Sequence, residues 1–180
     1  MPGENSTDRK QRELRDRLWP EAASWIWDRK DKKNKGFATI PRLLPLIMIL
    51  VKELAAKGEG DARLAYLELW SRARDNHIIS ITDEADIAYA SNCINQKRSS
   101  RTWADHMRVL ERLGFILIAP DGVRAIAHIL LLNPLAVAAR LQKEQKTPAG
   151  WWSVFTRRAA EVGAKIPAPA TMPPVPVPGT

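Results

Sequence analysis

The stretch SSRTWADHMRVLERLG, residues 99–114, decides the fold together with the stretch that follows it, FILIAPDGVRAIAHILLL, residues 115–132. At the helical spacing of 100° per residue, the first stretch predicts a two-sided helix over residues 100–113. Its apolar side consists of Trp103, His106, Met107, Val109, Leu110 and Leu113. Its opposite side consists of Arg101, Asp105, Arg108 and Arg112. The apolar side has to pack on a core, so the arginines have to face outward.

The residues after this helix predict a β-hairpin. Gly114 ends the helix, because glycine readily adopts the left-handed conformation found at helix ends. Residues 115–119 and 123–132 predict the two strands, and Pro120-Asp121-Gly122 predicts the turn between them. Asn133-Pro134 then predicts the N-cap and first residue of another helix.

Two further helices are predicted earlier in the chain. Pro41 is suited to open a helix that ends at Gly58, and Asp61 is suited to cap the next helix. The expected apolar stripe of that second helix is Leu64, Leu67 and Trp70.

A short strand and an acidic helix complete the pattern. The β-branched run His77–Ile81 predicts the strand, and Thr82 is expected to cap a helix that ends near Asn92. Helix, strand, helix, arginine helix and hairpin follow one another in the order of a winged helix. We therefore expect an α+β protein, mainly α with a small β-hairpin: a winged helix-turn-helix with extra N- and C-terminal helices.

The flanking segments divide the chain into four parts. Prolines are concentrated after residue 165, and charged residues before residue 36. The expected parts are a charged, partly helical extension over residues 1–35, a winged-helix domain over 36–142, a C-terminal helix over 143–165 and a disordered proline-rich tail over 166–180. Within them, Pro20 is expected to open a short helix with Trp25 and Ile26, and the last helix is expected over 151–165.

Composition excludes several classes of protein. The chain of 180 residues has a single cysteine, so it has no intrachain disulfide framework, and its three histidines lack metal-ligand spacing. No nucleotide-binding glycine motif occurs, and the sequence DEAD at residues 83–86 is better explained as acidic residues at a helix start. The apolar run 43–51 is too short to span a bilayer. We expect no catalytic site, cofactor, metal or membrane contact, and a cytoplasmic protein.

The net charge of +8 is unevenly distributed along the chain. Residues 36–96 carry six basic and eight acidic side chains, whereas residues 97–142 carry seven basic and three acidic ones. A local excess of positive charge on one folded element favours an oriented surface for nucleic acid. The residues predicted to contact double-stranded DNA are Lys97, Arg98, Ser99, Ser100, Arg101, Thr102, Asp105, Arg108, Arg112 and Arg124.

These residues have expected roles. Arg101, Arg108 and Thr102 would approach bases, while Lys97, Arg98, Ser100 and Arg112 would contact phosphates. Asp105 repels phosphate, so it either accepts from a cytosine amino group or orients its neighbouring arginines. His106 is expected to be a packing residue, and Trp70 and Trp103 are expected in the core.

Two alternatives stay open at this point. The charged stripe alone is also typical of an ordinary solvated helix face, with Asp105 paired to Arg101 and Arg108. A protein–protein adaptor is the other function, with the tryptophan-bearing ends and the proline-rich tail as its binding segments. A homodimer would suit a palindromic DNA site, but the sequence leaves the oligomeric state open.

Four stretches resemble a group of winged-helix proteins encoded on bacterial plasmids and related mobile elements. They are GFATIPRLLPLIMIL (36–50), AYLELWSRA (65–73), RTWADHMRVLERLGFI (101–116) and HILLLNPLAV (128–137). The resemblance spans residues 36–141 and implies a role in regulating plasmid or mobile-element replication or transcription. It also implies a bacterial protein associated with the nucleoid or a plasmid. The predicted turn 120–122 departs from the pattern of this group of proteins, because it carries little basic charge. This departure puts DNA contacts by the hairpin in question.

Overall fold

A computed structural model describes residues 6–18, 20, 36–93 and 99–169. By its internal contacts the chain divides into two units, Met1–Phe37 and Ala38–Thr180. In the first unit, α1 (Ser6–Leu18) is a highly polar helix in which Leu14 and Leu18 are exposed. The predicted helix with Trp25 and Ile26 lies outside the described residues.

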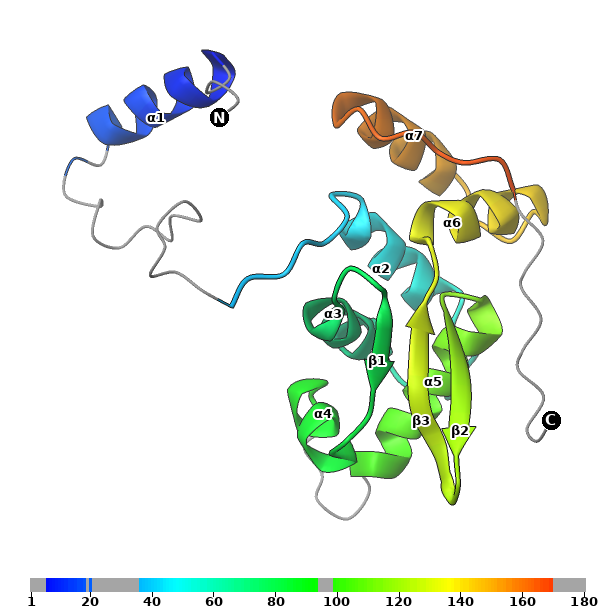
Figure 1. Cartoon of the computed structure of the whole chain (residues 1–180). Helices are drawn as coiled ribbons and strands as arrows, with labels where there is room; N and C mark the ends of the chain where they lie inside the picture. Colours follow the sequence, from blue (N-terminus) through cyan, green and yellow to red (C-terminus); the bar gives the residue numbers. More distant parts are fainter. Residues whose placement is uncertain (1–5, 19, 21–35, 94–98, 170–180) are drawn as a thin grey trace. The chain divides into compact units, whose positions relative to one another are not determined.

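The described part of the second unit is α+β, with helices around a three-stranded antiparallel sheet, as the sequence predicts (Figure 1). Its elements are α2 (Leu44–Glu53), α3 (Arg63–Arg72), β1 (Ile78–Ser80), α4 (Glu84–Ala90), α5 (Ser99–Leu113), β2 (Ile116–Asp121), β3 (Arg124–Leu131), α6 (Pro134–Lys143) and α7 (Trp151–Glu161).

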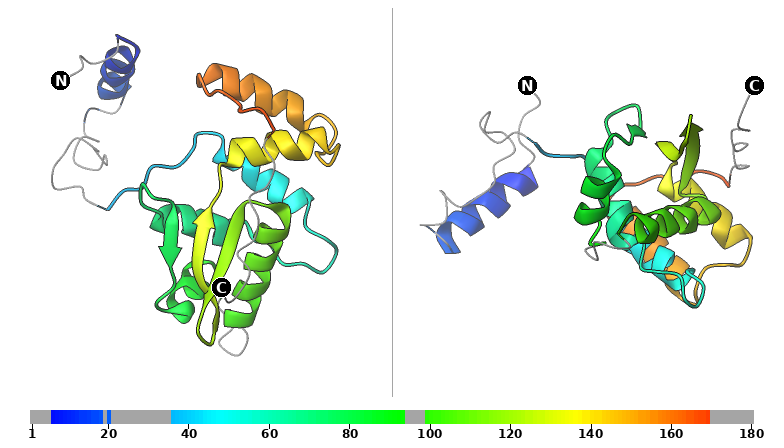
Figure 2. Two further views of the ribbon diagram at one scale, coloured as in Figure 1. Left: turned by 45° about the vertical axis from the view of Figure 1, so that its right-hand side comes forward. Right: turned by 90° about the horizontal axis from the view of Figure 1, so that it is seen from below.

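The sheet has the strand order β1-β3-β2, so the last strand lies between the other two. Ile129 of β3 pairs with Ile79 on one side and with Ile118 on the other. Cross-strand partners share one face of a sheet, and Ile79 and Ile129 are buried in the core. Helix α5 packs against the sheet and lies behind it in Figure 1, and α3 and α4 pack on α5. Figure 2 shows the sheet and the helices from two further sides.

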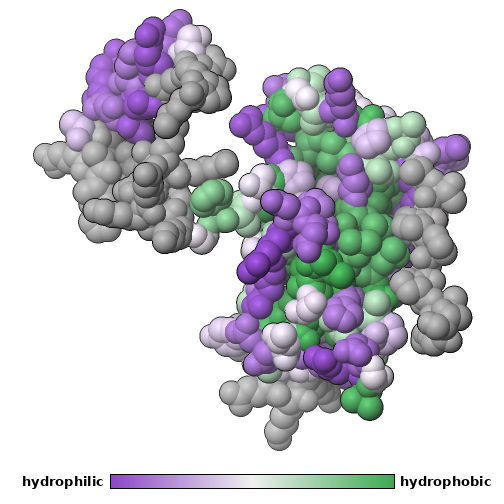
Figure 3. Space-filling view, in the orientation of Figure 1, coloured by the Kyte–Doolittle hydropathy of each residue, from purple (hydrophilic) through white to green (hydrophobic). Residues whose placement is uncertain are grey.

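The outer face of the sheet is partly apolar. The neighbouring row pairs Ile78, Leu130 and Leu117 across the three strands. Ile78 and Leu130 are exposed. Hydrophobic atoms gather over this part of the sheet in Figure 3.

Aromatic side chains fill the centre of the core. Trp103, Tyr66 and Phe115 are fully buried, and the rings of Tyr66 and Phe115 are 5.4 Å apart. Trp70 is also buried, and its ring meets the ring of Tyr66 edge to face. The predicted core positions of Trp70 and Trp103 are confirmed.

The predicted bounds of α2 are wrong. The helix begins at Leu44 rather than Pro41 and ends at Glu53 rather than Gly58. Pro45 lies in its first turn, where the missing N–H has no intrahelical partner to lose.

The start and the stripe of α3 also differ from the prediction. Its N-cap is Ala62, which makes no side-chain cap hydrogen bond. The Asp61 carboxylate accepts from the Arg63 N–H and also pairs with the Arg63 guanidinium. The buried side chains are Ala65, Tyr66, Leu69 and Trp70, and Leu64 is exposed. The predicted stripe omitted the large Tyr66 ring. Helix α3 turns Tyr66 rather than Leu64 toward the core.

The cap of α4 is Asp83, not Thr82. The Asp83 carboxylate accepts from the backbone N–H groups of Ala85 and Asp86, at 2.9 and 3.1 Å. The cap predicted for α6 is confirmed, since the side chain of Asn133 accepts from the N–H groups that follow Pro134.

The hairpin turn lies later than predicted. Pro120 is part of β2, and the turn is formed by Gly122 and Val123 between Asp121 and Arg124. The register shifts between Ala119 and Asp121. This irregularity explains how Pro120, which has no N–H for the ladder, remains within a strand.

The last helix, α7, ends at Glu161 rather than at residue 165 and packs on the core. The indole N–H of Trp151 donates to the Leu46 carbonyl of α2 at 3.0 Å. The ring of Trp151 stacks on Phe155 at 4.7 Å. Helices α6 and α7 therefore belong to the same unit as the sheet.

Candidate nucleic-acid interface

Helix α5 is amphipathic in the way that its sequence predicts. All six residues of the predicted apolar side are buried: Trp103, His106, Met107, Val109, Leu110 and Leu113. The four residues of the predicted charged side are exposed: Arg101, Asp105, Arg108 and Arg112. The unit thus presents a charged helix face to solvent.

Asp105 and Arg108 form an ion pair on this face. Nη1 of Arg108 lies 2.6 Å from Oδ1 of Asp105, and the side chains are 67% and 52% exposed respectively. Arg101, which precedes Asp105 by four residues, makes no ion pair with any residue that the structure describes. As far as the described residues go, the guanidinium donors of Arg101 are therefore available to a ligand.

Arg112 is positioned differently from the other arginines. Its Nη2 donates to the Glu59 carboxylate at 2.5 Å and lies 3.4 Å from the Leu54 carbonyl. The Ala56 N–H, and after it Arg112, hold the pKa of the Glu59 carboxyl below its usual range. Arg112 thus connects the end of α5 to the loop between α2 and α3.

The first turn of α5 contains three of the predicted hydroxyl contacts. Ser99, Ser100 and Thr102 lie there and are half-buried. The N–H groups of a first helical turn lack intrahelical partners, so this end of the helix favours an anion. Lys97 and Arg98, which precede it, lie outside the described residues.

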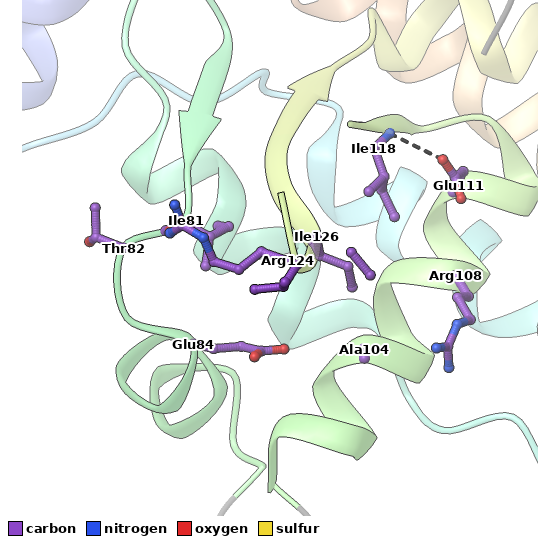
Figure 4. A pocket seen from close by; sticks show the side chains of 11 residues that line it. Ile81, Thr82, Glu84, Ala104, Arg108, Glu111, Ile118, Arg124 and Ile126 are labelled. Atoms are coloured by element: carbon purple, nitrogen blue, oxygen red, sulfur yellow. Dashed lines mark hydrogen bonds between the residues drawn. The ribbon is translucent and has the colours of Figure 1, made fainter. Parts of the chain in front are cut away.

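A groove of about 420 Å³ is lined by α5, by the hairpin and by the segment between β1 and α4 (Figure 4). Arg108 and Arg124 line it from opposite elements, and the carboxylates of Glu84 and Glu111 line it as well. The groove is thus of mixed charge. Its other lining residues are Ile81, Thr82, Ala104, Ile118, Val123, Ala125 and Ile126.

Two hydrogen bonds connect the hairpin to its neighbours. Arg124 donates from Nη1 to the Ile81 carbonyl at 3.1 Å. Oε1 of Glu111 accepts from the Ile118 N–H at 3.1 Å, the dashed line in Figure 4. Arg124 also lies 3.5 Å from the Asp121 carboxylate. Its guanidinium is therefore occupied within the protein, and the fully exposed hairpin tip is the apolar Val123.

Sequence reasoning missed three acidic residues around this surface. Glu111 lies three residues after Arg108 on the same helix, so helical spacing could have found it. Glu59 and Glu84 come from other elements, and only the tertiary fold brings them to Arg112 and to the groove.

His106 lies on the opposite, buried side of α5 and is confirmed as a packing residue. Its Nδ1 is 3.8 Å from the sulfur of Cys93, and its ring lies against Gly60. Burial lowers the pKa of His106, and the nearby charges of Asp61 and Asp105 oppose this effect.

Among the described residues, no three His, Cys, Asp or Glu side chains are grouped as metal ligands. No helix in the described ranges has the length and apolar character needed to cross a membrane. No protein-family model, no curated protein and no solved structure matches the chain.

Proposed function

We propose that the chain is a winged-helix protein that binds specific double-stranded DNA sequences, with α5 in the major groove. The observation that carries the proposal is the exposed face of α5 with Arg101 and Arg108. The succession α3, β1, α4, α5 and hairpin, together with the strand order β1-β3-β2, supports it. Control of replication or transcription on a plasmid or mobile element is the role that its sequence resemblance suggests.

The physical chemistry of α5 suits this role. A B-DNA major groove is about 12 Å wide and admits one α-helix. A guanidinium can donate two hydrogen bonds to O6 and N7 of guanine, and it also neutralises phosphates. The half-buried hydroxyls of Ser99, Ser100 and Thr102 surround the helix end that favours phosphate.

The hairpin has a supporting role in the proposed complex. Arg124 hydrogen-bonds the Ile81 carbonyl, and the tip carries Asp121 and Val123 rather than basic residues. We therefore assign sequence readout to α5 and phosphate contact to its N-terminal turn. Arg112, paired with Glu59, holds the far end of α5 in place.

The test compares two double variants of equal charge change. Arg101→Ala with Arg108→Ala removes two exposed arginines from α5, of which Arg108 pairs with Asp105. Arg157→Ala with Arg158→Ala does the same on α7, where Arg158 pairs with Glu161 at the same i,i+3 spacing. Duplexes selected from a random library by the full chain provide the ligand.

The α5 variant should lose specific retardation of the selected duplex and keep its thermal midpoint. The α7 variant should bind nearly as the unaltered chain does. Affinity of the unaltered chain should also fall steeply with salt, because phosphate contacts release counterions. Equal binding by both variants and the unaltered chain would refute the assignment of α5.

A protein-binding role is the second candidate, and the apolar outer row of the sheet favours it. Ile78 and Leu130 are exposed neighbours on β1 and β3. Trp151, which the adaptor hypothesis would use, is buried instead. Self-association that Leu130→Glu abolishes, without DNA binding at low salt, would favour this candidate.

A further inference from the structure

We infer that Asp105 is the specificity-determining residue of the proposed DNA site, where it aims Arg108 at a guanine and lowers affinity for all other sequences. The inference rests on the proposed function. It assigns Asp105 a positioning role, since the carboxylate acts mainly through the arginine that it holds.

The geometry of the pair is the first argument. Oδ1 of Asp105 accepts from Nη1 of Arg108 at 2.6 Å, and both side chains are more than half exposed. The pair lies on the face of α5 that also presents the exposed Arg101. It is therefore placed where a bound duplex would meet it.

The weak stabilising effect of such a pair is the second argument. An exposed ion pair at i,i+3 contributes little to folding, because water screens it and the side chains lose rotamer entropy. A carboxylate on a phosphate-facing surface meanwhile repels DNA. The stability of the fold therefore gives no strong reason for an aspartate at position 105, whereas selectivity among DNA sequences does.

The donor geometry of Arg108 provides the mechanism. With Nη1 engaged by Asp105, Nε and Nη2 remain to donate to O6 and N7 of one guanine. A held guanidinium loses less rotamer entropy on binding than a free one. The free oxygen of Asp105 can accept from the amino group of cytosine or of adenine, whereas the acceptor atoms of guanine, thymine and phosphate repel it. The choice of a G·C pair therefore comes from Arg108.

Removal of the carboxylate should thus raise binding to unrelated DNA and reduce selectivity. We expect Asp105→Asn to bind a scrambled duplex several-fold more tightly than the unaltered chain does. At one G·C pair of the selected duplex, we expect the ratio of its affinities for the selected duplex and for the duplex substituted at that pair to fall about tenfold. Arg108→Ala should reduce the preference at that same pair.

The experiment uses the full chain and fluorescent duplexes in competition at two salt concentrations. The probes are the selected duplex, each of its single transversions, and a scrambled duplex. Glu161→Gln is the matched control, because Glu161 pairs with Arg158 on α7 at i,i+3 and 2.9 Å, with similar exposure. Asp105→Ala is the second variant, and thermal midpoints establish that each protein is folded.

The outcomes separate this inference from the proposed function. Loss of preference at one G·C pair in both Asp105 variants and in Arg108→Ala, but not in Glu161→Gln, supports the inference. An equal gain of affinity for every duplex, with the preference retained, overturns it and leaves DNA binding by α5 intact. An unaltered chain without salt-dependent DNA binding overturns the proposed function and this inference together.

Discussion

At the scale of single residues, the exposed Gly60 lies against the buried ring of His106 and leaves no room there for a side chain. A Cβ atom at Gly60 would lie 2.9 Å from Cδ2 of His106 and closer still to Nε2. His106 is buried, so its ring has little room to move. We expect Gly60→Ala to lower the free energy of unfolding by about 1–3 kcal/mol, as measured by urea denaturation.

A double-mutant cycle distinguishes this clash from a loss of backbone flexibility. His106→Ala removes the ring that the new methyl group would meet. The double variant should therefore be more stable than the sum of the single effects predicts. Strict additivity would show that the contact is not the cause.

His106 should also make the free energy of unfolding depend on pH. Burial lowers the pKa of His106 in the folded protein, whereas the unfolded chain has the ordinary value of about 6.5. As the pH falls below this value, the unfolded chain binds a proton that the folded protein resists, so the free energy of unfolding decreases.

We expect this decrease between pH 7.5 and 5.5 and a flatter profile in His106→Phe, which keeps a ring but does not titrate. Equilibrium denaturation at several pH values measures both profiles. Parallel profiles for the two proteins would exclude His106 as the source of the effect.

At the scale of secondary-structure elements, the cap of α4 provides a direct comparison of two neighbouring residues. Asp83 accepts from two backbone N–H groups at the helix start, and Thr82 is exposed beside it. Asp83→Ala should lower the free energy of unfolding by about 1 kcal/mol. Thr82→Ala should change it by a few tenths at most, and chemical denaturation of both variants measures the difference. The reverse order would contradict the assignment of the cap.

This cap illustrates which parts of an element its sequence predicts. The strong periodicity of the sequence predicts both that α5 forms and which of its sides packs on the core. All six residues predicted on that side are buried. The ends of helices depend on which of several capable side chains forms the hydrogen bond. Thr82 and Asp83 are both suitable caps, and Asp61 accepts from the first N–H of α3 although the N-cap is Ala62. Local sequence cannot choose between such options, because tertiary contacts decide them.

In the candidate site too, features within one helix follow from the sequence, whereas contacts between elements do not. Helical spacing predicts that Arg101, Asp105 and Arg108 share one exposed face, as the structure shows. The partners of Arg112 and Arg124 come from distant parts of the chain, namely Glu59 and the Ile81 carbonyl. Spacing along one element carries no information on such contacts, so the extent to which these two arginines are occupied could not be predicted.

At the scale of the whole molecule, α7 determines how much of the chain unfolds as one unit. The sequence predicts this helix as a segment of its own, yet Phe155 has no exposed surface and stacks against Trp151. Trp151 in turn donates to the Leu46 carbonyl of α2. The last helix thus completes the core that begins with the first helix of the same unit.

Phe155→Ala should therefore destabilise the entire second unit rather than release α7 alone. Truncation of a fully buried phenylalanine costs about 3–5 kcal/mol, which is a large part of the stability of an ordinary domain. Val154→Ala is the control, since Val154 on the same helix is 40% exposed and should have a small effect. Tryptophan fluorescence, which includes the buried Trp70 and Trp103, and far-ultraviolet circular dichroism should give one coincident transition in each protein. A separate early transition in Phe155→Ala would show instead that α7 is an appendage whose loss leaves the sheet and the helix α5 folded.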